Sequence, residues 1–217
     1  MPAVSESTTA RLRREYEEAG LVEEAMAEDP FSEFESWFSG VLEAGLEEPN
    51  TFVLATATPD GAPSCRAVLM KELSREGIVF YTNLDSRKSR ELKANPRAAA
   101  TFVWVPLHRQ VRFEGRVELV SDEEADAYFA TRPRGAQIGA HASPQSEVVS
   151  SREALDARYA ELAEAYGDGE IPRPGFWGGW RLLPEVVEFW QGRPNRFHDR
   201  IRYRREGDRW IKERLAP

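Results

Sequence analysis

The sequence predicts a mainly β protein with short helices (an α+β composition), built as an antiparallel barrel. Its β-rich runs follow one another with short turns between them, and the helical segments are short insertions. The regular alternation of strands and helices that builds a parallel sheet is missing from the chain. With 217 residues, the chain can bury a substantial core. These observations together favour an antiparallel barrel.

The elements of the first half follow in order from residue 31. Two β-rich runs, Thr51–Thr58 and Ser64–Leu73, flank Pro59-Asp60-Gly61, where glycine supplies the positive φ of a hairpin turn. A strand at 78–82 precedes a short helix over Ser86–Ala94, which Asp85 or Ser86 can cap. Before these strands, six apolar residues recur at helical spacing and predict a helix over 31–45: Phe31, Phe34, Trp37, Phe38, Val41 and Leu42.

The second half begins with strands at 98–105 and 109–120, and Gly115 is expected to mark a bulge in the second. Two capping boxes then start helices. Ser121 with Glu124 begins a helix that runs to about Thr131, and Ser150 with Glu153 begins another over 151–166. The tail returns to β structure, with Glu206-Gly207-Asp208 between its last two strands. The strands expected there are 178–183, 186–191, 198–204 and 209–215.

Composition narrows the class of protein. The formal net charge of −8 argues against nucleic-acid binding, which relies on a basic surface. Cys65 is the single cysteine, which excludes an internal disulfide and a zinc site built from thiolates, so we expect no metal and a packing role for Cys65. No apolar run approaches the roughly 20 residues that span a bilayer, and nothing resembles a signal peptide. A cytoplasmic protein without a membrane partner is expected.

The arginine-rich stretch from Gly192 to Tyr203 stands out in this acidic chain. If it is extended, Arg196, His198 and Arg200 point to one face, together with Arg202. Like charges on one face repel one another unless an anion lies among them, which predicts a bound phosphate or carboxylate. The alternative is a solvated strand face whose arginines form salt bridges.

A second candidate anion site is the start of the helix expected over 86–94. Ser86, Arg87 and Lys88 lie where free amides and the helix dipole attract a phosphate. A merely solvated helix start is the alternative. Neither a G-x-G-x-x-G turn after a strand nor a Walker loop is present, so binding of a dinucleotide or nucleoside triphosphate by those motifs is not supported.

Seven strings of the sequence, taken in order, resemble the pyridoxamine/pyridoxine 5′-phosphate oxidase family of flavoproteins. The resemblance covers the chain from about residue 50 to 217 and implies a split β-barrel that binds flavin mononucleotide (FMN), with antiparallel, Greek-key-like strands. It implies one domain over 26–217 after a flexible segment over 1–25, able to act as a lid. The strings are R-A-V-L-M-K (66–71), F-Y-T-N-L-D-S-R-K (80–88), R-Q-V-R-F-E-G (109–115), R-P-R-G-A-Q-I-G-A (132–140), S-P-Q-S (143–146), F-W-G-G-W-R-L (176–182), and E-F-W-Q-G (188–192) with the terminal R-L-A-P (214–217).

The resemblance also implies which residues bind FMN. Those matched to its phosphate and ribityl chain are Arg66, Arg87, Lys88, Gln145 and Ser146. Those matched to the flavin ring or its pocket are Ala67, Val68, Leu69, Met70, Lys71, Tyr81, Thr82, Gln110, Trp190 and Arg200. Guanidinium groups grip phosphate with two hydrogen bonds, and the Gln110 amide can donate to a ring carbonyl.

The family substrate is itself a phosphate ester, so the resemblance implies a second anion site. Lys71, Tyr128 and Arg132 match it, but Ala136 stands where the family has a serine hydroxyl. Arg196 and His198, with Phe197 between them, match residues that hold the reacting carbon over the flavin and assist loss of a proton. Arg13-Arg14-Glu15-Tyr16 matches a segment that folds over the substrate.

The implied activity is oxidation of phosphorylated vitamin B6 compounds by O₂ in a homodimer with two flavins. We expect the 66–71 and 87–88 residues of one chain to meet Gln145, Ser146 and Trp190 of the other. Three alternatives remain open: a phenazine-biosynthesis oxidase of the same fold, a non-catalytic flavin- or haem-binding split barrel, and a module that binds a partner through the helix at 31–45. Retention of Tyr128 and of the 132–139 string argues against the first.

Overall fold

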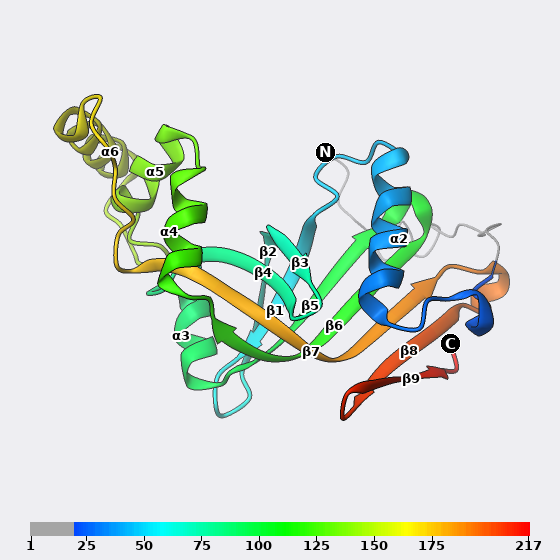
Figure 1. The fold of residues 1–217 in the computed structure, drawn as a ribbon. Coiled ribbons are helices and arrows are strands. Elements are labelled where there is room, and N and C mark those ends of the chain that lie inside the picture. Colours follow the sequence, from blue (N-terminus) through cyan, green and yellow to red (C-terminus); the bar gives the residue numbers. More distant parts are fainter. Residues whose placement is uncertain (1–19) are drawn as a thin grey trace, which may run out of the picture. The chain divides into compact units, whose positions relative to one another are not determined.

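The computed structural model describes residues 20–217, which form nine strands and five α-helices (Figure 1). Every strand pair whose register is known is antiparallel, so the predicted mainly β fold with short helices is confirmed. The helices are α2 Pro30–Glu43, α3 Arg87–Ala94, α4 Asp122–Ala130, α5 Arg134–Ala142 and α6 Arg152–Tyr166. The strands are β1 Thr51–Ala57, β2 Pro63–Leu69, β3 Glu72–Ser74, β4 Gly77–Asn83, β5 Arg97–Trp104, β6 Arg109–Leu119, β7 Trp177–Gln191, β8 Asp199–Glu206 and β9 Arg209–Arg214.

The described residues fall into two compact units that are not consecutive along the chain. The first unit holds residues 20–49, with Val103–Arg112 and Val186–Pro217. The second unit holds Asn50–Phe102 and Phe113–Glu185. Strands β5, β6 and β7 each supply residues to both units.

The second unit is built on the strand order β2, β1, β5, β6, β7, β4, β3. Phenylalanines on its strands form the core: Phe52 of β1 lies 5.2 Å from Phe102 of β5 and 5.9 Å from Phe80 of β4, ring centre to ring centre. The hairpin of β1 and β2 sets Leu54 opposite Arg66. Because Leu54 is fully buried, this register fixes β2 against the core.

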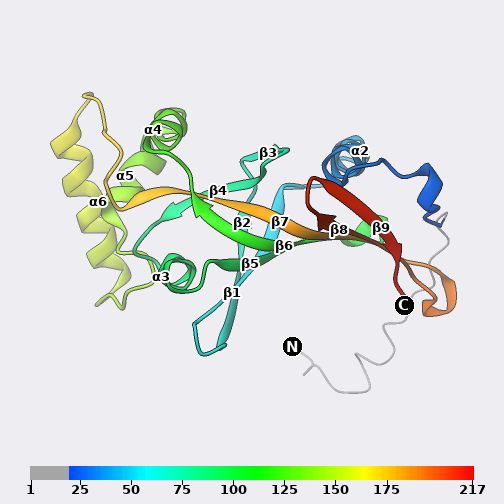
Figure 2. The same cartoon turned by 60° about the horizontal axis from the view of Figure 1, so that its bottom comes forward.

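Helices α4, α5 and α6 gather at the end of β7 that begins at Trp177 (Figures 1 and 2). The capping box of Ser121 and Glu124 is present at the start of α4, as predicted. The second predicted box is wrong, because Ser151 and not Ser150 caps α6 by accepting from the Ala154 amide. Helix α5 was not predicted, since Gly135 and Gly139 lower its helical propensity.

The first unit packs α2 with β8, β9 and the second half of β7. Asp29 caps α2 by accepting from the amides of Phe31 and Ser32, which confirms the predicted helix. Trp37 of α2 meets Phe189 of β7 edge to face, with ring centres 5.1 Å apart. The apolar stripe of this helix therefore forms the core of the first unit.

Residues 21–28, just before α2, are tied to β8 and β9 by polar contacts. The Arg214 guanidinium donates to Glu23 at 2.7 Å and to the Leu21 carbonyl at 2.7 Å. Lys212 donates to the carbonyls of Glu23 and Met26, each at 3.1 Å. Segments nearly 190 positions apart in the sequence thus complete one unit.

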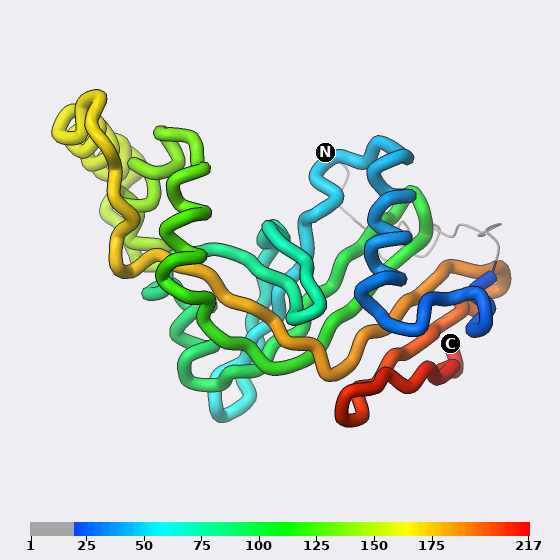
Figure 3. Tube along the Cα trace, in the orientation of Figure 1, coloured from blue at the N-terminus to red at the C-terminus, as the bar shows by residue number. Residues whose placement is uncertain are grey.

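Two strand predictions differ from the structure, and the bulge expected at Gly115 stays a prediction. The run Ser64–Leu73 is two strands, because the backbone leaves β1 at Met70, whose amide donates to the Asn50 carbonyl, and turns to pair with β4. The predicted strands 178–183 and 186–191 are one strand, β7, whose trace is unbroken over fifteen residues (Figure 3). At Gly115, a Cβ atom would lie 2.0 Å from the Leu183 carbonyl, so the close backbone explains this glycine.

Candidate functional site

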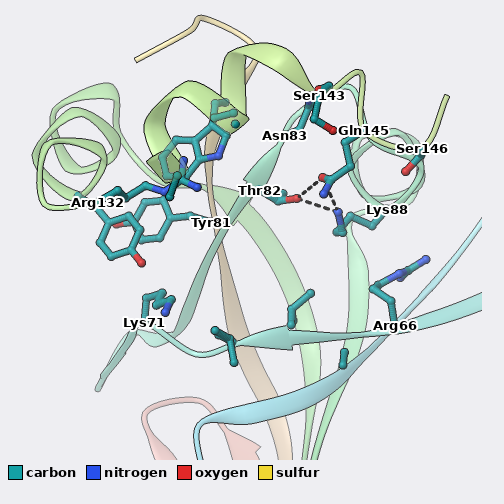
Figure 4. Close-up of a pocket in the computed structure, with 18 of the residues that line it drawn as sticks. Arg66, Lys71, Tyr81, Thr82, Asn83, Lys88, Arg132, Ser143, Gln145 and Ser146 are labelled. Atoms are coloured by element: carbon teal, nitrogen blue, oxygen red, sulfur yellow. Dashed lines mark hydrogen bonds between the residues drawn. The ribbon is translucent and has the colours of Figure 1, made fainter. Parts of the chain in front are cut away.

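A cavity of about 1000 Å³ opens in the second unit and collects most of the predicted site (Figure 4). Its volume is at the upper end of the range for small-molecule sites, roughly 300–1,000 Å³. The predicted residues that line it are Arg66, Ala67, Val68, Leu69, Lys71, Tyr81, Thr82, Arg87, Lys88, Tyr128, Arg132, Gln145 and Ser146. Met70 is buried outside this lining, and Arg13, Arg14, Glu15 and Tyr16 lie outside the described residues.

Lys88 lies at one end of the cavity, in the first turn of α3. Its Nζ donates to Thr82 Oγ1 at 2.7 Å, to Ser86 Oγ at 3.1 Å and to Gln145 Oε1 at 3.0 Å. The side chain is buried, and burial, assisted by the charge of Arg66, lowers the pKa of Lys88 to about 8. A bound anion here would relieve the cost of burying this ammonium group.

Ser86 occupies the N-cap position of α3, but the predicted cap is wrong. Its hydroxyl donates to the Asn83 carbonyl at 2.7 Å and accepts from Lys88, and it makes no capping bond. The first amides of α3 are therefore not capped by this side chain, which leaves the favourable end of the helix dipole beside the cations of the cavity.

Arg66 of β2 lies at the same end of the cavity as Lys88 (Figure 4). Its guanidinium donates to the Leu54 carbonyl at 3.3 Å, Thr56 Oγ1 at 2.6 Å and Ser64 Oγ at 2.5 Å. It also lies 3.5 Å from the carboxylate of Glu91, a residue that was not predicted. The sequence signal for Glu91 is its spacing from Arg87. The two residues are four positions apart on one helix, which indicates an ion pair between them.

Arg132 and Lys71 lie at the other end, beside Tyr81 (Figure 4). The Arg132 guanidinium stacks over the Trp177 ring, 4.7 Å from its centre, and its buried Nη1 has no hydrogen-bond partner among the described residues. Burial lowers the pKa of Arg132 below its usual value, against the opposing effect of Tyr128. A buried guanidinium nitrogen without an acceptor suits an anionic ligand.

An aromatic stack forms the wall next to Arg132. The rings of Tyr81 and Tyr128 lie 4.0 Å apart and nearly parallel, and Trp177 lies 5.5 Å from Tyr81. Gly179 permits the stack, because a Cβ there would lie 2.8 Å from the Tyr81 ring. Trp177 was not predicted as a site residue although it belongs to the string 176–182. Ala136 lines the cavity, and its backbone amide donates a hydrogen bond to the Pro133 carbonyl.

The other predicted site residues belong to the first unit, where Gln110 and Trp190 line a smaller cavity of about 410 Å³. The His198 ring lies 4.6 Å from the Trp190 ring, and its Nδ1 accepts a hydrogen bond from the Arg193 amide at 3.1 Å. That bond assigns the proton of the neutral ring to Nε2. Burial, followed by the charge of Arg196, lowers the pKa of His198 below its usual value.

The prediction that residues 196–202 share one extended face is wrong. Asn195 and Arg196 have positive φ values of 56° and 60° in a 3₁₀ turn, and β8 begins at Asp199. The anions beside the arginines are side chains of the protein: Arg200 pairs with buried Glu188 at 2.7 Å, and Arg202 pairs with Glu213 at 2.5 Å. Phe197 is exposed in the turn.

The expectation that Gln145 and Ser146 complete the site of a second chain is also wrong for this structure. Both line the same cavity as Arg66 of their own chain, and Gln145 Oε1 accepts from Thr82 at 3.0 Å. No group of three or more potential metal ligands is clustered among the described residues. Within residues 20–217, every helix is too short or too polar to cross a membrane.

Comparison with known proteins finds two family models. The model for pyridoxamine 5′-phosphate oxidase matches residues 38–165, and that for the pyridoxine 5′-phosphate oxidase C-terminal dimerisation region matches 177–217. The pyridoxine/pyridoxamine 5′-phosphate oxidase of Rubrobacter xylanophilus is 56% identical over 217 residues, with 100% of both chains covered. The Salinibacter ruber protein of the same name is 54% identical, with 97% of this chain and 100% of that one covered.

Two solved structures share the fold. PhzG from Burkholderia lata 383, in complex with tetrahydrophenazine-1-carboxylic acid, is 32% identical with a TM-score of 0.85, covering 89% of this chain and 95% of that one. A pyridoxamine 5′-phosphate oxidase-related, FMN-binding protein from Nostoc punctiforme is 18% identical with a TM-score of 0.69, covering 88% and 100%. The fold is thus the split β-barrel of these proteins.

Proposed function

Because the chain belongs to the pyridoxamine 5′-phosphate oxidase family, we propose that it oxidises pyridoxamine 5′-phosphate and pyridoxine 5′-phosphate to pyridoxal 5′-phosphate with bound FMN. Two electrons and two protons leave the substrate and reduce O₂ to hydrogen peroxide. The amine substrate also consumes water and releases ammonia. This activity would serve vitamin B6 biosynthesis and salvage, and a cytoplasmic location stays a prediction.

The observation that carries this proposal is the pair of cationic groups at opposite ends of one cavity (Figure 4). Arg66 and Lys88 form one group, with Arg87 beside them, and Lys71 and Arg132 form the other. The reaction needs two phosphates in one site, one on the cofactor and one on the substrate. The buried ammonium group of Lys88 and the unpartnered Nη1 of Arg132 each fit such a dianion.

When bound, FMN would supply the two-electron redox chemistry. Arg66, Arg87 and Lys88 would hold its phosphate, while Thr82, Gln145 and Ser146 offer hydrogen bonds along the cavity. Arg132, Lys71 and Tyr128 would hold the substrate phosphate, and the stack of Tyr81, Tyr128 and Trp177 would exclude water from one side. Gln110, Trp190 and Arg200 keep the flavin role that the family resemblance implies.

For His198, the geometry supports a narrower role than assistance with proton loss. Since Nδ1 accepts from the Arg193 amide, neutral His198 presents Nε2–H as a hydrogen-bond donor for the substrate. Its lowered pKa keeps the ring neutral near pH 7. Arg196 brings the positive charge of this turn, and we assign both side chains to orienting the reacting carbon.

A phenazine-biosynthesis oxidase is the second candidate, favoured by the similarity to PhzG at 32% identity. The ligand in that structure carries a carboxylate and no phosphate, whereas this chain keeps the cationic group around Arg132. An assay for peroxide and aldehyde decides between them, with FMN added to pyridoxamine phosphate, pyridoxine phosphate, their unphosphorylated forms and tetrahydrophenazine-1-carboxylic acid. Turnover of the phosphorylated forms alone supports the proposal. A yellow protein without turnover of any of them would indicate a non-catalytic flavin carrier.

The affinity of the apoprotein for FMN is expected to fall as pH rises above about 8. Below that pH, Lys88 is protonated and attracts the phosphate, which is already a dianion. Above it, the ammonium group loses its proton, and each further pH unit weakens binding by up to about tenfold. Titration of flavin fluorescence from pH 6.5 to 9.5 measures this. Lys88→Met should bind FMN weakly with no step near pH 8, and a step that persists in this variant would contradict the assignment.

We also propose that the working unit is a homodimer, supported by the match of residues 177–217 to a dimerisation region. Val53 in the second unit and Val103 and Val105 in the first expose apolar surface that a second copy can cover. Light scattering is expected to report about twice the chain mass of 24.6 kDa. A flavin-loaded, active monomer would contradict this.

A further inference from the structure

Glu91 is a buried carboxylate behind the wall of the cavity, one helical turn after the lining residue Arg87 in α3. Only 5% of it is exposed. Its Oε2 accepts from Thr56 Oγ1 and Ser64 Oγ, each at 2.5 Å, and its Oε1 accepts from Arg87 Nε at 2.8 Å. The Arg66 guanidinium completes the set at 3.5 Å. Four donors from β1, β2 and α3 thus converge on one side chain.

These donors keep Glu91 charged. Burial would raise the pKa of Glu91, but the hydrogen bonds from Ser64, Thr56 and Arg87 outweigh it and hold the pKa at about 2. A carboxylate that stays ionised inside the wall can balance a guanidinium on either side of it at any physiological pH. Without it, Arg66 and Arg87 would repel each other across the same wall.

The two arginines depend on Glu91 to different degrees. Arg66 has further acceptors in Leu54, Thr56 and Ser64, two of which are themselves fixed by Glu91. The Arg87 side chain is 60% exposed, and its tie to the wall is the bond to Glu91. When a long exposed side chain is held at one nitrogen, its remaining donors keep a fixed direction. Binding an anion then loses less side-chain entropy.

We infer that Glu91 is a positioning residue that holds the guanidiniums of Arg66 and Arg87 ready for the phosphate of the cofactor. This inference rests on the proposed binding of FMN. It goes further by naming a residue that touches no ligand and yet sets the preference for a phosphorylated flavin over an unphosphorylated one.

Two other readings make different predictions. If Glu91 only fastens α3 to the hairpin of β1 and β2, its loss weakens the fold and every flavin equally. If its negative charge mainly repels the phosphate, its removal strengthens FMN binding. Positioning predicts a loss that is confined to the flavin that carries a phosphate.

The test is Glu91→Gln in the full-length apoprotein, titrated with FMN and with riboflavin by quenching of flavin fluorescence. Glutamine keeps the shape and one acceptor but loses the charge that both guanidiniums share. We expect FMN affinity to fall at least about tenfold and riboflavin affinity to change less than about twofold. Glu147→Gln is the matched control. It removes the surface ion pair with Arg90, which lies on α3 as Glu91 does, and it should change neither affinity.

A double-mutant cycle shows whether Glu91 acts through Arg66. Glu91→Gln should lower the logarithm of FMN affinity in an Arg66→Gln background by less than half as much as it does in the wild-type protein. Full additivity, equal losses for both flavins, or unchanged or tighter FMN binding would each overturn the inference. Failure of wild-type apoprotein to prefer FMN over riboflavin would instead refute the proposed cofactor.

Should Glu91→Gln not fold, Glu91→Asp decides the question, because it keeps the charge but withdraws the carboxylate from both guanidiniums. A loss of FMN affinity with riboflavin affinity retained supports positioning, and no selective loss overturns it. Melting temperatures of the apoproteins show which variants are folded.

Discussion

His198→Asn is expected to lower kcat about 100-fold while the protein remains yellow. Asparagine can still accept from the Arg193 amide with its side-chain oxygen, so the turn that holds residue 198 should persist. It has no atom at the position of Nε2, and the donor proposed to orient the substrate is lost. The measurement is steady-state turnover of pyridoxine phosphate together with flavin content.

His198→Gln is the informative companion to this variant. Its side-chain amide nitrogen reaches the position of imidazole Nε2 and carries hydrogens, so it should recover much of the turnover that asparagine loses. If His198 acted as a general base, neither the asparagine nor the glutamine amide could replace it. Equal loss in both variants would therefore contradict the donor role. Because burial lowers the pKa of His198, any loss of wild-type kcat through protonation of this ring should begin at a lower pH than for an ordinary histidine.

Arg132→Ala is expected to lower kcat/KM for the phosphorylated substrates about 100-fold or more, since it removes a half-buried guanidinium from a phosphate dianion. Activity on unphosphorylated pyridoxine, which we expect to be low in the wild-type protein, should hardly change. Steady-state kinetics with both substrates gives the comparison, and the kcat/KM ratio between them should collapse toward unity.

Arg134→Ala serves as the control for Arg132→Ala. Arg134 is exposed and donates to the carbonyls of Gly167 and Gly169, outside the lining of the cavity. Its replacement should leave the preference for phosphorylated substrates intact. If Arg132→Ala lowered activity on both substrates equally, Arg132 would be acting on the fold or the flavin, and its assignment to the substrate phosphate would be wrong.

Local sequence signals predicted the fold where the physics is local. The capping box at Ser121 and the apolar stripe of α2 act within one or two helical turns, and both are confirmed. The break at Met70 depends on pairing with Asn50, which is distant in sequence, and no local pattern reports it. Helix α5 was missed for a related reason, since Ile138 is buried against Phe129 and Trp177 and this packing overrides two glycines.

The site was predictable in part. The strings that resemble the family contain every predicted residue that lines the cavity except Tyr128, yet they did not reveal Glu91, whose partners Thr56 and Ser64 lie on a separate hairpin. The turn at Asn195 and Arg196 was not predicted because the alternation of side chains assumes an extended backbone. The sequence gives no sign that an arginine adopts the left-handed conformation. Glu188 was not predicted, because the two arginines that balance its charge come from different strands and are distant from it in sequence.

The polar ties between residues 21–28 and strands β8 and β9 bear on how the protein is made. Leu21 and its acceptor Asp199 are 178 positions apart, so the N-terminal partner leaves the ribosome long before the other exists. At typical rates of synthesis, that wait is roughly 10–40 seconds. Throughout it, the aromatic stripe of α2 lacks Phe189 and stays open to chaperones or to other nascent chains. Slow codons or a stalled ribosome before β8 would lengthen this exposure and lower the yield of folded protein without changing a single residue.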